Sequence, residues 1–230
     1  MNLLGHFAAP KFTNRTTGNA RSEVLPEEEG MGCLHGIRIL AISGSLRTLS
    51  SNTAALEAAA YLAPTGVEVC LYHGLASLPH FNPDDDQLLL PDPVAELRRQ
   101  VSMSDALLIA SPEYAHGIAG VLKNALDWLV GSLDFAGKPV AILNTSPRAF
   151  HADAQLREVL ATMAGQLVRA ASFRVPIAGR QLDVAAVVSD PQLSQQLRAA
   201  LMALTPTRDR HGTGNKSSQS RPRNMEGAGA

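Results

Sequence analysis

The expected fold rests on the stretch Gly44-Ser45-Leu46-Arg47-Thr48-Leu49-Ser50-Ser51-Asn52. It directly follows the apolar run Ile37 to Ser43 and leads into the alanine-rich stretch Thr53 to Leu62, which has helical character. Ligands of open parallel sheets bind at the edge where such strands end. The stretch therefore predicts a strand, a small polar loop at that edge, and a helix.

Further apolar runs alternate with stretches of helical period along the chain. The predicted strands cover Ile37–Ser43, Val67–Tyr72, Asp105–Ser111, Pro139–Thr145 and Ala171–Pro176. Predicted helices cover Thr53–Leu62, a segment that starts at Asp92, Val121–Trp128, His151–Val168 and Pro191–Leu204. Asn52 or Thr53 is expected to cap the first helix, and Asp92 the second. Strict alternation of strand and helix predicts an α/β fold, with a parallel sheet covered by helices on both faces.

The two ends of the 230-residue chain differ from its middle. Residues 1–35 and 205–230 are rich in Gly, Ser, Thr, Arg, Asn and Pro and show no sustained apolar period. Such composition is typical of disorder. We therefore expect a disordered N-terminal extension over 1–35, one folded domain over 36–204 and a disordered C-terminal tail over 205–230.

Charge and composition exclude several classes of function. A formal net charge of -1 gives no basic excess for binding nucleic acid. No apolar run approaches the roughly 18 residues of a membrane span, so a cytoplasmic protein without a membrane partner is expected. Cys33 and Cys70 lie far apart, which favours thiols in a reducing compartment. No metal site is predicted, and the acidic run Asp84 to Asp86 is interpreted as a solvated turn.

The loop Gly44 to Asn52 has the chemistry of an anion site. Backbone N–H groups at a helix start attract negative charge, hydroxyl groups add donors, and the Arg47 guanidinium matches a phosphate. The sequence lacks the Gly-Lys-Ser/Thr ending of a nucleotide triphosphate loop, the three-glycine dinucleotide turn and the Gly-x-Ser-x-Gly elbow. A ligand with a terminal phosphate is predicted. From this loop alone, a polar turn without a ligand is an equal alternative.

A second loop, Ser111-Pro112-Glu113-Tyr114, follows another predicted strand. Pro112 forces an irregular exit from the strand, and Tyr114 offers a planar apolar face. Gly117 and Gly120 allow close approach of the backbone. The helix that follows reads Val121-Leu122-Lys123-Asn124-Ala125-Leu126-Asp127-Trp128.

Together the two loops resemble the NAD(P)H-dependent FMN reductases, a family of flavodoxin-like flavoproteins that includes quinone and chromate reductases. Its first motif, Gly-Ser-Leu-Arg followed at fixed spacing by Ser and Asn, matches Gly44, Ser45, Leu46, Arg47, Ser50 and Asn52. Its second motif matches Pro112, Glu113, Tyr114, Gly120 and Leu122 to Trp128. The resemblance runs from about Ile37 to Val175.

The resemblance implies a flavodoxin-like, doubly wound, five-stranded parallel sheet that binds FMN. The implied FMN-binding residues are Ser45, Leu46, Arg47, Ser50 and Asn52 near the phosphate, Pro112, Glu113, Tyr114 and Ala115 along the ring, and Thr145 and Ser146 in a third loop. Ala115 departs from the family, which usually has Asn there. A side-chain contact to the flavin is expected to be lost, with His116 as a substitute or as a solvent-facing residue.

The implied activity is hydride transfer from NADPH or NADH through FMN to a small-molecule acceptor such as flavin, quinone or chromate. No side chain is nominated as catalytic, because the flavin carries the chemistry. The loops His73–Asp92 and Pro147–Asp153 are candidates to shape the open face. Arg148 is either a contact to a cofactor phosphate or a surface arginine. Alternatives are a flavodoxin-like electron carrier, which the weak net charge disfavours, and a non-catalytic flavin-binding regulatory protein.

The family also implies a homodimer or homotetramer. The helix that contains Trp128 is a candidate for the subunit interface, with a core position for its apolar stripe as the alternative. The sequence leaves open the physiological acceptor and the preference between NADH and NADPH.

Overall fold

The computed structural model describes residues 36–88, 90–175 and 183–205. Our predictions for the terminal segments 1–35 and 206–230, which include Cys33, lie outside the described residues. So does Pro176, the last residue of the fifth predicted strand.

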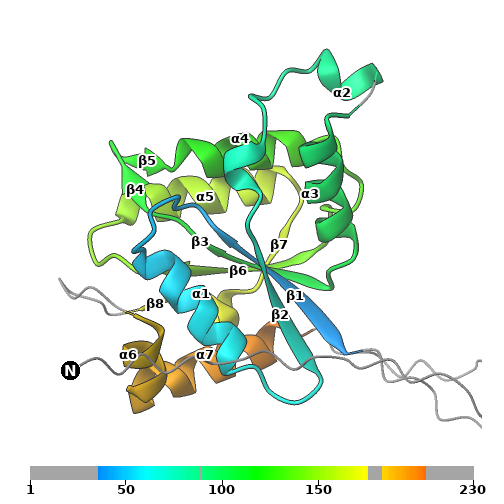
Figure 1. The fold of residues 1–230 in the computed structure, drawn as a ribbon. Coiled ribbons are helices and arrows are strands. Elements are labelled where there is room, and N and C mark those ends of the chain that lie inside the picture. The colour runs from blue at the N-terminus through cyan, green and yellow to red at the C-terminus, as the bar shows by residue number, and fades with distance from the viewer. Residues whose placement is uncertain (1–35, 89, 176–182, 206–230) are drawn as a thin grey trace, which may run out of the picture. The chain divides into compact units, whose positions relative to one another are not determined.

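A parallel sheet forms the centre of the fold (Figure 1). Its strand order is β2 (Val67–Tyr72), β1 (Ile37–Ser43), β3 (Ala106–Ala110) and β6 (Pro139–Asn144). The fifth position is shared by two short strands, β7 (Gln166–Leu167) and β8 (Phe173–Arg174), which both pair in parallel with β6. The chain thus builds outward from β1 in both directions, which is the flavodoxin-like order. The predicted fold class is confirmed.

Helices cover both faces of the sheet (Figure 1). The face with α3, α4 and α5 and the face with α1, α6 and α7 each bury an apolar cluster. A small antiparallel hairpin follows β3. The bounds are α1 Ser51–Tyr61, α3 Asp92–Ser102, α4 Gly120–Leu129, α5 Phe150–Thr162, α6 Val184–Ser189 and α7 Pro191–Leu204, with β4 Glu113–Tyr114 and β5 Gly117–Ile118 in the hairpin.

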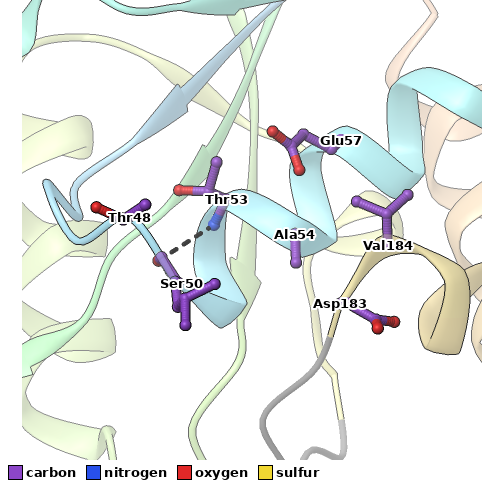
Figure 2. A pocket seen from close by; sticks show the side chains of 8 residues that line it. Thr48, Ser50, Thr53, Ala54, Glu57, Asp183 and Val184 are labelled. Atoms are coloured by element: carbon purple, nitrogen blue, oxygen red, sulfur yellow. Dashed lines mark hydrogen bonds between the residues drawn. The ribbon is translucent and has the colours of Figure 1, made fainter. Parts of the chain in front are cut away.

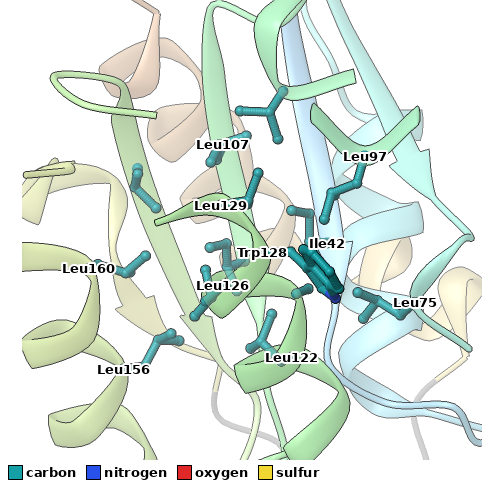
Figure 3. Close-up of a cluster of buried hydrophobic side chains, with 14 of the residues drawn as sticks. Ile42, Leu75, Leu97, Leu107, Leu122, Leu126, Trp128, Leu129, Leu156 and Leu160 are labelled. Atoms are coloured by element: carbon teal, nitrogen blue, oxygen red, sulfur yellow. The ribbon is translucent and has the colours of Figure 1, made fainter. Parts of the chain in front are cut away.

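Alternating side chains of each strand enter opposite layers of the core. Leu40 and Ile42 of β1 pack toward α4, whereas Ile39 and Ala41 pack toward α1. Trp128 is fully buried beside Ile42 and Leu75 in the first layer (Figure 3). Of the two alternatives for this helix, a core position is therefore correct for Trp128. Its side chain is not available for contact with a second subunit.

Several predicted helix ends were wrong. Asn52 and Thr53 lie inside α1, and the Oγ of Ser50 caps the helix by accepting from the Thr53 N–H at 3.4 Å. Pro91 is the N-cap of α3 without a side-chain cap bond, and Asp92 occupies the first turn, where a carboxylate favours the helix dipole. 

The helix α5 also ends earlier than predicted, at Thr162 instead of Val168. Ala164 takes a left-handed conformation with φ of 58°, and the Gly165 N–H donates to the Leu160 carbonyl at 2.9 Å. Such geometry ends helices. It turns the chain back to form β7. The fifth predicted strand shortens to Phe173–Arg174 because a 3-10 turn, η2 (Arg169–Ala171), occupies its start.

The long connection between β2 and α3 contains two short helices, η1 (Leu75–Ser77) and α2 (Asp85–Leu88). The acidic run was predicted to be a solvated turn, but Asp86 forms a 2.7 Å ion pair with Arg98 of α3. Arg98 also donates to the Trp128 carbonyl, so the pair joins this connection to two helices. In the described part of the chain, no cluster of three or more metal-ligating side chains forms.

Cys70 lies in β2, as predicted, and its thiol is free. Burial raises the pKa of this thiol, which lowers its reactivity as a nucleophile. Within the described ranges, no helix combines the length and the apolarity needed to cross a bilayer.

Candidate functional site

A cavity of about 330 Å³ opens at the carboxyl edge of the sheet. It is enclosed by the three loops that follow β1, β3 and β6, as the parallel order predicts. All predicted site residues except Leu46 and Ala115 line it. The lining comprises Ser45, Arg47, Ser50, Ser51, Asn52, Pro112, Glu113, Tyr114, Thr145, Ser146, Arg148 and Ala149. Arg148 was considered from the sequence as a phosphate contact. Ser51 was missed because it is not a motif position of the family, and Ala149 because it has no polar side chain.

The first loop is packed tightly onto the sheet. The Gly44 N–H donates to the Ala110 carbonyl at 2.8 Å, which continues the pairing of β1 with β3. A Cβ at Gly44 would lie 3.1 Å from Ser111 Oγ and 3.3 Å from Leu122. Glycine is therefore required here for close approach of the loop to β3 and α4. The loop then delivers the N-terminus of α1 to the cavity, where Ser51 and Asn52 line it.

A direct bond joins the first loop to the third. Asn52 is 7% exposed, and its Oδ1 accepts from the Thr145 hydroxyl at 2.8 Å. Both residues were predicted to bind the cofactor. Both residues line the cavity, and the bond between them holds α1 against the end of β6.

The charged residues of the cavity lining are two arginines and one carboxylate, Glu113. Arg47 and Arg148 both line it, together with the hydroxyl groups of Ser45 and Ser146. Among the described residues, no carboxylate forms an ion pair with either arginine. Guanidinium groups and a helix N-terminus are the donors that bind phosphate in proteins. The donor set therefore fits a phosphate-bearing ligand.

A second cavity of about 390 Å³ shares Ser50 with the first, and Figure 2 shows its lining residues. Its described lining includes the carboxylates of Glu57 and Asp183, with Thr48 and Thr53, and none of the lining residues in the described ranges is an arginine or a lysine. A phosphate dianion would be repelled by these carboxylates. The arginine side chains make the cavity with Arg47 the better match for a phosphate.

The hairpin β4–β5 carries the middle of the second motif. Its two turn residues, Ala115 and His116, have φ of 47° and 62°. Positive φ at both central residues is the signature of type I′ turns, which favour Asn-Gly because other side chains are strained there. The Asn that the family usually has at position 115 is therefore a suitable turn residue. Ala115 does not line the cavity, so its consequence in this chain is backbone strain in the turn.

The neighbouring side chains of Glu113 and Tyr114 make different contacts. Tyr114 is 53% exposed and lines the cavity. It also borders a smaller pocket that includes Leu46, Ala119 and Val121, which is where the structure places Leu46. The Glu113 carboxylate instead accepts from the Ala152 N–H of α5 at 2.9 Å.

The family follows from comparison with known proteins. Residues 37–179 match the family model of NADPH-dependent FMN reductases. The chain belongs to this family. The predicted family is thus confirmed, and its motifs are those that enclose the cavity.

Related proteins agree with this family. The chain is 36% identical over 173 residues to an NAD(P)H-dependent FMN reductase of Pseudomonas aeruginosa, which covers 73% of this chain and 93% of that relative. It is 34% identical over 113 residues to a quinone reductase of Escherichia coli, over 48% of this chain and 60% of the relative. The solved structure of FerB, a flavoenzyme NAD(P)H:(acceptor) oxidoreductase from Paracoccus denitrificans, superposes with a TM-score of 0.59 at 30% identity, over 73% of this chain and 94% of FerB.

In this FMN reductase family member, the helical part of the second motif supports the scaffold. Asn124 Nδ2 and Trp128 Nε1 both donate to the Pro79 carbonyl at 2.8 Å. The Phe81 N–H donates to Asn124 Oδ1, and the Phe81 ring meets the Trp128 ring edge to face at 5.0 Å. These contacts fix the connection between β2 and α3. Sequence reasoning missed them, although Asn124 and Trp128 are four apart and thus share a helix face.

Proposed function

We propose that this protein is an NAD(P)H-dependent oxidoreductase that binds FMN in the cavity at the ends of β1, β3 and β6 and reduces quinone-like small molecules. The observation that carries the proposal is the pair Arg47 and Arg148 with the N-terminus of α1 in one cavity. The cofactor is supported by the family, and the acceptor class by the quinone reductase of Escherichia coli among its relatives.

Residues of the three loops would divide the binding of FMN. Ser45, Arg47 and the first N–H groups of α1 would hold the phosphate, with Arg148 and Ser146 closing the far side. The segment from Pro112 to Tyr114 would line the ring. When bound, FMN supplies the redox chemistry by accepting hydride from NAD(P)H and passing electrons to the acceptor. The chain itself would bind and orient FMN and leave one side of the flavin ring accessible. No side chain is proposed as a general acid or base.

We also propose a homodimer or homotetramer that works in the cytoplasm. Support for the assembly comes from large apolar side chains that are more than half exposed around the cavity, namely Leu46, Leu49, Tyr114 and Phe150. A second copy would bury them. The free thiol of Cys70 fits a reducing compartment. Light scattering on the purified FMN complex tests the assembly, and a monomeric mass would contradict it.

An anaerobic absorbance titration tests the proposed activity. FMN is added to the purified protein, unbound flavin is removed, and NADPH or NADH is then added, followed by a benzoquinone. We expect the bound flavin band to bleach with at least one nucleotide and to return with the quinone. A bound flavin that neither nucleotide reduces would favour a carrier or regulatory protein. A protein that retains no flavin would contradict the assignment of the cavity.

A further inference from the structure

Three contacts hold the β4–β5 hairpin against the start of α5. Glu113 Oε2 accepts from the Ala152 N–H at 2.9 Å. Gln155 Oε1 accepts from the Ile118 N–H at 2.8 Å. The rings of His116 and His151 meet edge to face, with centroids 4.4 Å apart. We refer to these three contacts as the hairpin clamp.

The clamp joins the two opposite walls of the cavity. One wall is the segment Pro112 to Tyr114, which leads into the hairpin, and the other is the segment Thr145 to Ala149, which leads into α5. The wall that leads into the hairpin has little regular pairing of its own, since β4 and β5 contribute two residues each. Pairing of β3 with β6 ends at Ala110 and Leu143, so beyond these residues the distance between the walls depends on contacts between the hairpin and α5.

Within the clamp, Glu113 has the strongest contact. Its side chain is 15% exposed, and Oε1 lies 3.6 Å from His116 Nδ1 of the same hairpin. The N-cap of α5, Ala149, has no side-chain oxygen to offer the first turn. Glu113 supplies the missing acceptor from another segment, and its negative charge lies at the positive end of the helix dipole. A charged acceptor makes this bond stronger than a bond between neutral groups.

Two features show that the hairpin needs such a restraint. Ala115 and His116 both hold positive φ, which strains the turn. A Cβ at Gly117 would lie 3.2 Å from Gln155 Oε1, so the hairpin lies close to α5. The strained turn therefore persists because contacts to α5 hold it.

We propose that Glu113 is a positioning residue that sets the spacing of the two cavity walls, and so the affinity for FMN, through its bond to the start of α5. The proposal rests on the proposed function. It gives Glu113 a role different from the direct cofactor contact that the motif implies, because its carboxylate is bonded to the Ala152 N–H.

The test compares FMN dissociation constants, measured by quenching of flavin fluorescence, for four variants. Glu113→Ala removes the acceptor, and we expect a roughly tenfold weaker affinity, as for the loss of one charged hydrogen bond. Glu113→Gln keeps an oxygen that can accept from Ala152 N–H, so its affinity is expected within about threefold of the wild type. Glu158→Ala removes an exposed carboxylate of the same helix and serves as the control. Arg47→Ala reports on the phosphate site.

The outcomes separate the positioning role from the flavin site itself. Wild-type affinity in Glu113→Ala together with weak binding in Arg47→Ala overturns the positioning role and leaves the FMN site intact. Unchanged affinity in both variants contradicts the FMN site. A loss in Glu113→Ala that Glu113→Gln does not rescue also overturns the proposal, because it would then be the charge that binds or steers the ligand.

A second variant keeps the test decisive if Glu113→Ala fails to fold. Gln155→Ala removes the neighbouring contact of the hairpin clamp while it leaves the capped helix start in place. We expect its FMN dissociation to be faster by about threefold, in line with the loss of one neutral hydrogen bond. An unchanged dissociation rate in a folded Gln155→Ala would overturn the clamp as a determinant of FMN binding.

Discussion

The loop after β1 and the segment after β3 carry the two family motifs, yet they use their polar side chains differently. In the first, Ser45 and Arg47 line the cavity, and no ion pair of Arg47 forms within the described ranges. In the second, Glu113, Asn124 and Trp128 are hydrogen-bonded to distant parts of the chain. Both motifs contribute cavity-lining residues, but Arg47 of the first has no ion pair in the described ranges, whereas these three residues of the second have long-range hydrogen bonds.

The largest effect is expected where the second motif supports the scaffold. Trp128→Ala removes a fully buried indole and its bond to Pro79, so we expect the free energy of unfolding to fall by about 3–5 kcal/mol. Urea unfolding measures this change. Trp128→Phe keeps most of the buried area and is the matched control. A wild-type midpoint for Trp128→Ala would show that α4 does not depend on this residue.

A substitution in the first loop should weaken ligand binding and leave the stability of the fold nearly unchanged. Arg47→Ala should weaken FMN binding by about 10- to 100-fold, or about 1.5–3 kcal/mol, because a charged contact to phosphate is lost. Stability without FMN should change by less than about 0.5 kcal/mol, as at other surface sites. Titration with FMN and unfolding of the apoprotein give the two values. Arg99→Ala, on the distant helix α3, controls for the loss of one positive charge.

Arg47→Ala could instead lower the free energy of unfolding of the apoprotein by as much as it weakens FMN binding. That result would contradict the difference proposed between the two segments. Arg47 would then be a scaffold residue like Trp128.

A smaller effect of opposite sign is expected at the hairpin turn. Ala115→Asn should raise the free energy of unfolding by roughly 0.5–1 kcal/mol, because Asn adopts positive φ more readily than Ala. Thermal unfolding measures the gain. Ala115→Val, with a β-branched side chain at the same φ, should be destabilising. A lower midpoint for Ala115→Asn would refute the explanation of the family Asn as a turn residue.

The smallest effect concerns a carboxylate far from both loops. Hydrogen bonds from Arg99 and Gln100 lower the pKa of Glu96 to about 2. A carboxyl with a lowered pKa stabilises the fold above the pKa of the unfolded chain, and this contribution is lost as the pH falls toward 2. Because Glu96 is exposed, the effect should be small and weaker in salt.

Acid unfolding of the wild type and Glu96→Gln would measure this contribution. The variant should be slightly less stable at pH 7, and the two curves should converge near pH 2. Equal stability throughout would mean that solvent screens the bonds entirely.

Sequence reasoning worked best where the signal is local. The bounds of β1, β2 and α7 were predicted to the residue, because each is a continuous apolar run or a regular stripe. It failed at the end of α5, where the left-handed Ala164 stops a helix whose apolar period continues. The length of the fifth strand was also predicted wrongly. Of the predicted run, only Phe173 and Arg174 form the strand that pairs with β6, which apolar composition does not reveal.

The candidate site was predictable in its location but not in its internal contacts. Parallel order brings the loops after β1, β3 and β6 to one edge, so the meeting of Arg47 with Pro112 and Ser146 could be anticipated. The bonds from Thr145 to Asn52 and from Ala152 to Glu113 join residues 93 and 39 positions apart. Their geometry depends on packing of whole helices, which no local pattern encodes.

The central claim is that the loop after β1 binds the phosphate of FMN, and comparison of FMN with riboflavin tests it most directly. The two ligands share the ring and differ in the phosphate. We expect FMN to bind at least about 100-fold more tightly to the wild type, since two charged contacts are worth about 3 kcal/mol or more together. The difference should shrink in Arg47→Ala. Equal affinity of the wild type for FMN and riboflavin would contradict the account.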